Sequence, residues 1–473
     1  MLAMVGACGI RRTGRGLLIA LAVSVGIPAG FAAEPETTAP GPAEPPDPGS
    51  SIEPLQAEPA EAEPDESEAP EPKLLGDLGG LRPALDRYGI GLELGYIGET
   101  FGVVHGGVKR GASYEGQASA GLSFDLEKML GWPGAKIYAN ALQIHGRGAS
   151  RTLLGGNLET VSNIEALPTT RLYRLYFEQS LFEDRISVRL GQIAADDEFI
   201  TSETAGGLIN GTFGWPAWTA ADTRGGGPAY PLPQPGVRLQ VKPAPDFILR
   251  SAAFSGNPGG KNCPSGDPQQ CDPHGVLFPF SGGTLWIGEV AYSANSGKGA
   301  AGLPGVYKLG GWYETGPFPW QLDPAVSKRN NGGVYAVVDQ GIWRRPERDE
   351  QGLNFFLRMG GAPSDRNFLS LYADAGIGFR APFVSRPDDV VTLGAAYGNV
   401  SADALRAERL AGSPNSASDY AAVIELSYKA AILPGWTVQP DLQYVFNPGQ
   451  NVGGSSEAVP NALILGLRTT LTF

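Results

Sequence analysis

The sequence predicts an all-β protein, a transmembrane antiparallel β-barrel of about sixteen strands. Three observations predict it. From Leu92 onward, segments of roughly ten residues alternate apolar and polar side chains. Turns rich in glycine and proline separate them, with 67 glycines and 40 prolines among 473 residues. The chain ends on an alternating run closed by Phe473. The mean hydropathy of −0.12 also fits, because each lipid-facing residue of a barrel alternates with a polar lumen-facing one.

The individual strands follow from the period of two, at which neighbouring side chains point to opposite faces. Val237, Leu239 and Val241 share one face of segment 237–242, for example, and the residues between them are polar. Segments 136–145 and 248–254 do not separate cleanly into two faces. Sixteen segments are expected to begin near residues 92, 119, 136, 171, 186, 237, 248, 284, 306, 334, 353, 371, 391, 421, 438 and 463.

A soluble β-sandwich would show the same alternation, so other features have to decide between the two folds. One is a set of aromatic residues near strand ends, where a membrane barrel carries its girdles. They are Tyr96, Tyr138, Tyr292, Tyr313, Tyr397, Tyr428 and Trp436. The other is the last strand, in which every second residue from Leu463 is apolar or Thr469 and which ends on Phe473. It resembles the C-terminal signal by which the insertion machinery of bacterial outer membranes takes up barrels.

The first 33 residues are expected to be an export signal peptide. Arg11, Arg12 and Arg15 precede a short apolar run over 17–27, and small residues at 30–33 offer a cleavage site. The run is too short and too close to the N-terminus for a spanning helix. Downstream, no stretch reaches the roughly 18 apolar residues that such a helix needs, so the sequence argues against a helical membrane protein.

Residues 34–73 differ in composition from the rest of the chain. They are mostly proline, glutamate and alanine and hold 12 of the 49 acidic residues, so we expect a disordered acidic linker on the periplasmic side. The linker is either a solvated spacer or a tether to the cell wall. Residues 74–473, the expected barrel, carry 37 acidic and 32 basic residues, and this mild acidity argues against a nucleic-acid partner.

Long segments between strands are candidates for loops on the outer side: 146–168, 196–235, 257–282, 318–331 and 400–419. Segment 257–282 contains Cys263 and Cys271, which remain once the signal peptide is removed. Two cysteines in an exported loop favour a disulfide. The alternative is a zinc site with His274, although two thiols and one histidine at this spacing match no common zinc template.

Signatures of enzymes are missing from the sequence. The three histidines, His105, His145 and His274, are scattered, and no Gly-x-Ser-x-Gly motif is present. The sequence therefore predicts no catalytic residues, no metal and no cofactor.

Several blocks resemble the carbohydrate-selective porins of the OprB family. They begin with Leu75-Gly76-Asp77-Leu78 and continue, in the order of the family, through 81–90, 191–199, 210–216, 235–239, 254–258 and 335–340. The resemblance covers about 74–473 and leaves out the acidic linker. It implies a bacterial outer-membrane porin through which glucose and other small sugars diffuse passively. A general or differently selective porin, or a plugged structural barrel tethered to the cell wall, is the alternative.

Loop 196–235 is the first candidate for the pore lining. It begins with Asp196, Asp197 and Glu198 and contains Trp215 and Trp218. Carboxylates hydrogen-bond sugar hydroxyls and tryptophan rings stack on sugar C–H faces, although a solvated acidic turn followed by an aromatic packing cluster would contain the same residues.

Charged residues on the polar faces of the strands are the second set of candidates. Arginines facing carboxylates across a lumen would narrow it and produce a transverse field. Any single one of these residues is more often a structural charge of the lumen wall. The set is Arg174, Glu178, Arg189, Arg238, Arg250, Asp339 and Arg358.

Overall fold

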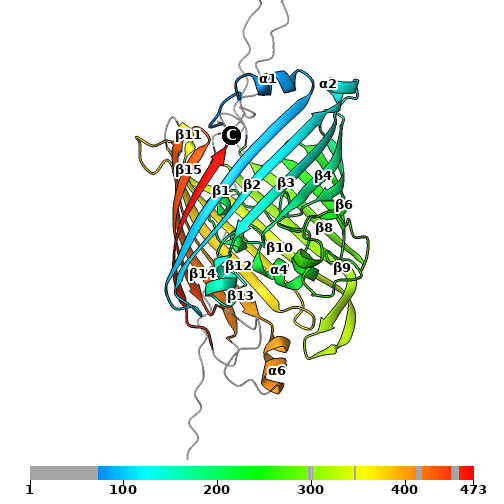
Figure 1. Cartoon of the computed structure of the whole chain (residues 1–473), viewed down its shortest axis with the longest axis vertical. Coiled ribbons are helices and arrows are strands. Elements are labelled where there is room, and N and C mark those ends of the chain that lie inside the picture. The colour runs from blue at the N-terminus through cyan, green and yellow to red at the C-terminus, as the bar shows by residue number, and fades with distance from the viewer. Residues whose placement is uncertain are drawn as a thin grey trace, which may run out of the picture. The chain divides into compact units, whose positions relative to one another are not determined.

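The computed structural model describes residues 73–473 apart from 157, 297–299, 301, 346–347, 412–417 and 449–457. The expected signal peptide, and the expected linker except Lys73, lie outside the described residues. Sixteen antiparallel strands, each paired with the next along the chain, form a closed barrel (Figure 1). All sixteen segments expected from the alternation begin inside or within one residue of a strand, so the predicted fold is confirmed.

The strands are β1 (Ile90–His105), β2 (Gly111–Asp125), β3 (Ala135–Gly146), β4 (Thr169–Leu181), β5 (Ile186–Ile193), β6 (Gln234–Ala244), β7 (Phe247–Ser255), β8 (Thr284–Ala294), β9 (Gly305–Trp320), β10 (Asp323–Arg345), β11 (Arg348–Gly361), β12 (Leu369–Arg380), β13 (Val390–Val400), β14 (Tyr420–Leu433), β15 (Trp436–Phe446) and β16 (Ala462–Thr472). The short helices are α1 (Leu81–Asp86), α2 (Leu126–Leu130), α3 (Ala149–Leu153), η2 (Ala205–Gly207), η3 (Gly211–Phe213), α4 (Ala217–Asp222), η4 (Arg224–Gly226), α5 (Pro268–Cys271) and α6 (Ala402–Leu410). Within the described residues, no helix has the length and apolar character to cross a membrane.

The wall of the barrel is apolar outside and polar inside. Leu309 on β9 is 68% exposed, and Leu190 and Leu467 are exposed as well. Charged residues on the inner face of the wall, such as Arg358 on β11 and Glu425 on β14, are buried. A β-sandwich would bury its apolar faces instead. This inverted burial distinguishes a membrane barrel from the soluble alternative, which the period of two alone does not.

The barrel closes where the last strand meets the first. β16 pairs with β1 from Gly95↔Thr472 onward, and the backbone N–H of Phe473 donates to Leu94 O at 2.9 Å. The segment before β1 covers this seam, because Leu74 N donates to Thr472 O and the Arg82 guanidinium contacts the carbonyls of Leu92 and Phe473. Every strand therefore has two neighbours, which a wall in hydrocarbon requires.

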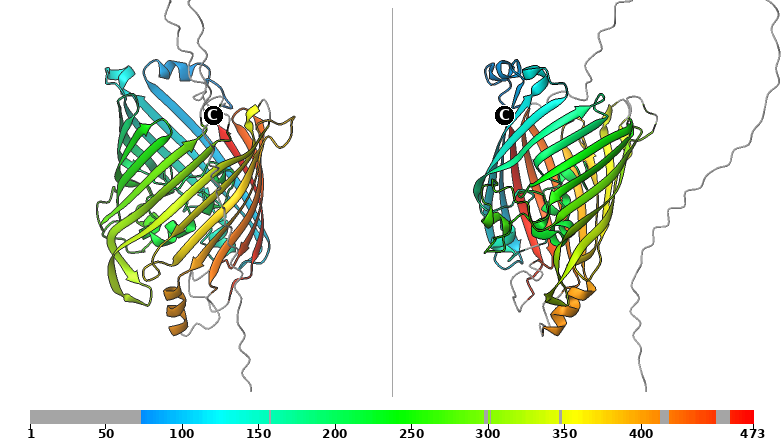
Figure 2. Two further views of the ribbon diagram at one scale, coloured as in Figure 1. Left: turned by 180° about the vertical axis from the view of Figure 1, so that it is seen from behind. Right: turned by 90° about the vertical axis from the view of Figure 1, so that its right-hand side faces the viewer.

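The two ends of the barrel differ in the length of their connections. Tight turns such as 434–435, together with α1, α2 and the C-terminus, lie at one end, and α6 lies at the other (Figure 2). The connections at the α6 end include 147–168, 194–233 and 256–283. Outer-membrane barrels have short periplasmic turns and long outer loops, so we assign the α6 end to the outside.

One predicted outer loop is wrong. Residues 318–331 form the continuation of the β9–β10 hairpin, with Gln321 and Leu322 between the strands. The paired segment contains prolines at 317, 319 and 324, and its register shifts between Asp323 and Ser327 and between Arg329 and Asn331.

Of the aromatic residues predicted to form a girdle on the lipid-facing surface, several lie on that surface and one points into the lumen. Tyr292, Tyr313 and Tyr397 are exposed on the outer face. Tyr138 points into the lumen, where its hydroxyl donates to Glu93 at 2.7 Å. The error has a simple cause, because β3 does not separate cleanly into an apolar and a polar face.

The outward position of Leu309 leads to a prediction. Leu309→Arg should destabilise the barrel in lipid vesicles by about 2–4 kcal/mol, because it places a charge in hydrocarbon. Asn354→Arg on β11, whose neighbours Leu353 and Phe355 take the lipid-facing positions, is the matched control and should cost much less. Denaturant titration of both variants in vesicles measures the difference, and equal losses would contradict the assignment of the two faces.

Candidate functional site

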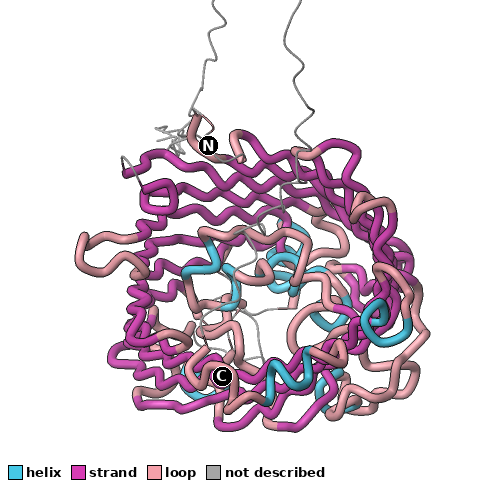
Figure 3. The backbone as a smooth tube through the Cα atoms, turned by 90° about the horizontal axis from the view of Figure 1, so that it is seen from above, coloured by secondary structure: helices cyan, strands magenta, loops and turns pink. Residues whose placement is uncertain are grey.

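The connection between β5 and β6, residues 194–233, runs across the inside of the barrel and carries η2, η3, α4 and η4. Figure 3 shows helices and loops inside the ring of strands. Phe199, Leu208 and Phe213 of this inward loop are buried in the main hydrophobic cluster of the molecule. Inward-facing strand residues such as Phe101 and Val423 belong to the same cluster, so the loop and the wall together form an apolar core inside the barrel.

Trp218 of the inward loop packs directly on the backbone of the wall. Its side chain is 1% exposed, and a Cβ atom at Gly360 or Gly333 would lie within 2.6 Å of its ring. Glycine at these two positions of β10 and β11 thus allows the close approach. The structure places Trp218 in a packing cluster with Trp312, away from any open part of the lumen.

Arg358 on β11 fastens the inward loop to the wall. Its guanidinium donates to the carbonyls of Ile200, Thr212 and Gly214 at 3.1, 2.9 and 2.9 Å. On its other side it pairs with Asp374 of β12 at 2.5 Å, and both side chains are buried. A buried charge has to be paired in this way, and the pairing leaves no donor of Arg358 facing open lumen.

Carboxylates from three other strands bind the loop as well. Glu425 on β14 accepts from the backbone N–H groups of Ile209 and Asn210 at 2.5 and 2.9 Å. Glu289 on β8 accepts from Ile200 N at 3.0 Å. Asp339 on β10 accepts from Ser202 Oγ at 2.8 Å and from Thr204 N at 3.2 Å. The loop is thus held from several sides of the barrel.

A cluster of charges lies where the inward loop begins. Arg238 on β6 bridges Glu178 on β4 and Glu198 of the loop at 2.9 and 2.8 Å. Arg189 on β5 reaches the same two carboxylates at 3.1 and 3.5 Å. Beside them Arg174 pairs with Asp197. In this cluster three guanidinium groups face three carboxylates in direct contact.

A cavity of about 610 Å³ lies between the inward loop and the wall formed by β1 to β4. Three residues predicted from the sequence, Arg174, Asp196 and Trp215, line it together. The Trp215 indole N–H already donates to Gly226 O at 3.0 Å, so the ring face is what this side chain offers. Residues not predicted as lining, among them Glu93, Tyr138, Asn140 and Arg468, complete the cavity.

Asp196 has an altered acidity. It lies in the inward loop, not on a strand, and burial together with the neighbouring charge of Asp197 raises the pKa of its carboxyl to about 7. The backbone N–H of Tyr230, 2.9 Å from Asp196 Oδ2, acts in the opposite direction. The charge of Asp196 therefore changes near neutral pH.

The remaining predicted residues lie apart from this cavity. Arg250 on β7 donates to Gln240 Oε1 at 2.7 Å and lies 3.7 Å from Glu289, beside the charge cluster. Asp339 lines a second cavity of about 370 Å³ with Arg344 and Arg380. The structure thus brings together most of the predicted set and separates Trp218, Arg358 and Asp339 from it.

Apart from Asp339, the carboxylates that hold the loop or its arginine anchor were not predicted from the sequence. Glu289, Glu425 and Asp374 lie on inward faces, which the alternation identifies. The partners of the two glutamates are backbone N–H groups of a distant loop, and such partners leave no pattern in a sequence.

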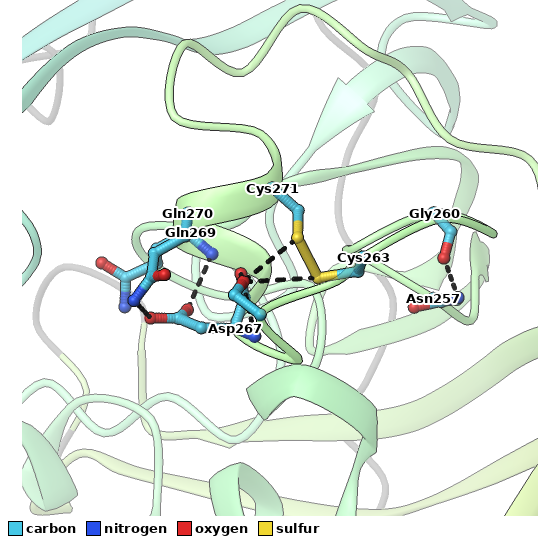
Figure 4. The surroundings of a disulfide bond; sticks show 8 residues. Asn257, Gly260, Cys263, Asp267, Gln269, Gln270 and Cys271 are labelled. Carbon is cyan, nitrogen blue, oxygen red and sulfur yellow. Dashed lines mark hydrogen bonds between the residues drawn. A yellow bond between two sulfur atoms is a disulfide. The ribbon is translucent and has the colours of Figure 1, made fainter.

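Cys263 and Cys271 form the predicted disulfide, with Cα atoms 5.4 Å apart (Figure 4). The bridge encloses the start of α5, where Asp267 caps the helix by accepting from Gln269 N at 2.9 Å. His274, the third residue of the zinc alternative, has its Nδ1 2.9 Å from Thr170 O. The paired sulfurs are not available as thiolate ligands.

A closed barrel of sixteen strands, apolar outside and polar inside with a loop folded into its lumen, is the architecture of an outer-membrane porin. The chain belongs to the OprB family of carbohydrate-selective porins, whose family model matches residues 109–473. The resemblance of residues 75–90 to the family lies before the matched range. Family and fold are those of transport channels.

Known proteins of this kind are similar over most of the chain. Porin B of Pseudomonas aeruginosa is 25% identical over 440 residues, which cover 85% of this chain and 91% of that protein. A putative porin of Acinetobacter baylyi, QuiX, is 22% identical over 85% of this chain and 93% of its own length. The high-pH structure of Pseudomonas putida OprB superimposes with a TM-score of 0.74 at 23% identity and covers 85% of this chain and 99% of that one.

The buried clamp of Arg358 leads to a prediction. Arg358→Ala should cost about 3–5 kcal/mol, because it leaves Asp374 buried without its partner. It should also raise single-channel conductance by freeing the inward loop.

Arg380→Ala is the control, since the ion pair of Arg380 with Glu203 is exposed. Recordings from both variants in planar bilayers make the comparison. An Arg358→Ala channel that folds and conducts like the unchanged protein would contradict the anchoring role.

The acidity of Asp196 leads to another prediction. As pH rises from 6 to 8 the carboxyl loses its proton, the lumen becomes more negative, and preference for cations should increase. Asp196→Asn keeps an oxygen that can accept from Tyr230 N and should remove most of this change. Reversal potentials in a salt gradient measure it, and an unaltered pH response in the variant would refute the assignment.

Proposed function

We propose that this chain lets glucose and other small sugars diffuse passively across the outer membrane through the cavity beside the inward loop. One observation carries the proposal: this cavity combines a carboxylate, a guanidinium and aromatic rings, in Asp196, Arg174 and Trp215. A sugar presents hydroxyl donors and acceptors at its edges and C–H groups on its faces. Such a lining matches both, and no metal or covalent step is needed.

The pairing of positive and negative side chains in the lumen supports a neutral molecule as the transported solute. In the cluster of Arg174, Arg189 and Arg238, each guanidinium contacts at least one carboxylate of Glu178, Asp197 and Glu198. An ion passing these pairs meets little net charge of either sign. A sugar still finds polar groups with remaining hydrogen-bonding capacity, and weak binding of this kind permits exit.

The other predicted lining residues have different roles in this proposal. Trp218 and Arg358 set the position of the inward loop and thereby the width of the path. Asp339 and Arg250 contribute to the periplasmic half of the lumen. The alternative of a plugged structural barrel draws support from the apolar core around the loop, and a steady sugar flux would exclude it.

Two further partners belong to the proposal. The last strand, which ends on Phe473, is the segment we propose the insertion machinery recognises. Residues 34–73, outside the described part apart from Lys73, are proposed to extend into the periplasm, where contact with the cell wall would hold the barrel in place. Neither partner is needed for permeation.

Sugar flux into liposomes tests the proposal. The unchanged protein should admit glucose faster than an amino acid of similar size. Trp215→Ala and Arg174→Ala should each slow glucose about fivefold, for a loss of about 1 kcal/mol of transient binding.

Trp132→Ala, in the periplasmic turn before β3, is the matched control and should leave the rate unchanged. Equal rates for glucose and the amino acid would indicate a general porin. Unchanged glucose flux in both lumen variants would remove these residues from the pathway.

A further inference from the structure

An apolar groove of about 1020 Å³ lies on the outer surface of the barrel. Its floor consists of lipid-facing residues of neighbouring strands, Leu175 and Phe177 on β4, Leu190 on β5, Val237 on β6 and Ala253 on β7. These side chains lie on the faces opposite the charge cluster of the lumen, because Glu178, Arg189 and Arg238 each precede or follow one of them in a strand. The groove and the sugar cavity are therefore separated by the wall.

A segment of the connection between β7 and β8 forms the roof. Residues 276–280 read Val-Leu-Phe-Pro-Phe, and Phe278 and Phe280 line the groove. Phe280 is 81% exposed, and Val276 and Leu277 are more than half exposed. A contiguous exposed run of this kind is unfavourable in water and marks contact with an apolar medium or partner. We call 276–280 the apolar strap.

Both ends of the apolar strap are fastened to the barrel. Before it, Leu172 N donates to His274 O at 2.9 Å, and Asp272 accepts from Val276 N at 3.1 Å. After it, Gly256 N donates to Gly283 O at 3.0 Å. The strap thus runs from the outer end of β4 to the outer end of β8, over β5 to β7.

The space between the roof and the floor of the groove exists because several residues facing it have short side chains or none. Ala253 is short compared with its neighbours in the floor, and Gly282 and Gly283 of the roof have no side chains. The polar residues in the lining, such as Gln192, Ser281 and Thr284, are uncharged, and no charged side chain lines the groove. An anionic or cationic group would find no partner inside it.

We propose that this groove binds an acyl chain of a lipid from the outer leaflet of the surrounding membrane. Its floor is continuous with the lipid-facing wall, and its roof is fastened at the outer ends of strands, so it opens at the level of that leaflet. An acyl chain between strap and wall is in contact with apolar side chains on both sides. Ordinary annular lipid contacts the wall on one side and exchanges freely.

The groove belongs to the lipid-facing side of the wall and is separate from the sugar pathway. A lipid held in this way would persist through detergent extraction, whereas annular lipid would be removed. Failure of the sugar proposal leaves it intact, since flux through the lumen and retention of lipid outside are measured separately.

Native mass spectrometry of the mature protein tests the proposal. The delipidated protein in maltoside detergent is titrated with palmitoyl-oleoyl phosphatidylglycerol as the probe. One lipid should remain bound at an activation energy that removes all others.

Ala253→Phe fills the groove with an apolar side chain and should reduce this retained adduct at least tenfold. Ala395→Phe, at an exposed alanine on the lipid-facing side of β13, is the control and should retain the lipid. Phe280→Ser removes one of the two phenyl rings of the roof that line the groove and leaves the wall unaltered. It should also weaken retention, and it tests the proposal if Ala253→Phe does not fold. Heat-modifiable migration in gels checks that each variant is a barrel.

Three results would overturn the proposal. The first is equal retention of lipid by the Ala253→Phe and Ala395→Phe barrels. The second is that the unchanged protein loses its last lipid at the same activation energy as the annular lipid. The third is a lipid-free dimer that Phe280→Ser dissociates. The last result would assign the groove to a second copy of the chain.

Discussion

The pairing of β16 with β1 closes the barrel, and without this closure the sheet could not stand in a membrane. In hydrocarbon an unpaired backbone N–H or C=O group costs several kcal/mol, so a sheet is stable there only when it has no edge. Closure gives every strand two neighbours and fixes which face of each strand meets lipid. The two-residue period then sends leucines such as Leu309 outward and charges such as Arg238 inward. The seam is covered by the segment around Arg82, which binds the C-terminal carbonyl.

The polar inner face imposes a second requirement, because charged side chains in a narrow lumen need hydrogen-bonding or ionic partners. The inward loop meets it by presenting backbone groups to Arg358, Glu289 and Glu425 while burying its own apolar side chains. Where the loop enters, carboxylates and guanidinium groups pair with one another. The space that remains is uneven, and one cavity of about 610 Å³ lies beside β1 to β4. The width and chemistry of the path thus result from how the loop is fastened.

The alternation predicted the fold nearly completely, because burial of one face in lipid imposes a strict period of two on every strand. It failed where other constraints override the period: at 318–331, where bulges accommodate prolines, and at Tyr138, on a strand without clean faces. Of the cavity lining, the sequence pointed to Arg174, which lies on a strand, and to Asp196 and Trp215 of the inward loop. The buried state of Trp218 and Arg358 was not predicted, since it depends on the path of a loop whose anchors are backbone atoms distant in sequence.

The closed wall should be apolar on its outer face and in contact with water on its inner face. Nitroxide scanning along β6 distinguishes the two faces, with single labels at each position of 237–242 in lipid vesicles. Accessibility to oxygen should peak at Val237, Leu239 and Val241, and accessibility to a water-soluble nickel complex at Gln240 and Lys242, with the two periods out of phase. Accessibilities that rise and fall together, or show no period of two, would contradict the account.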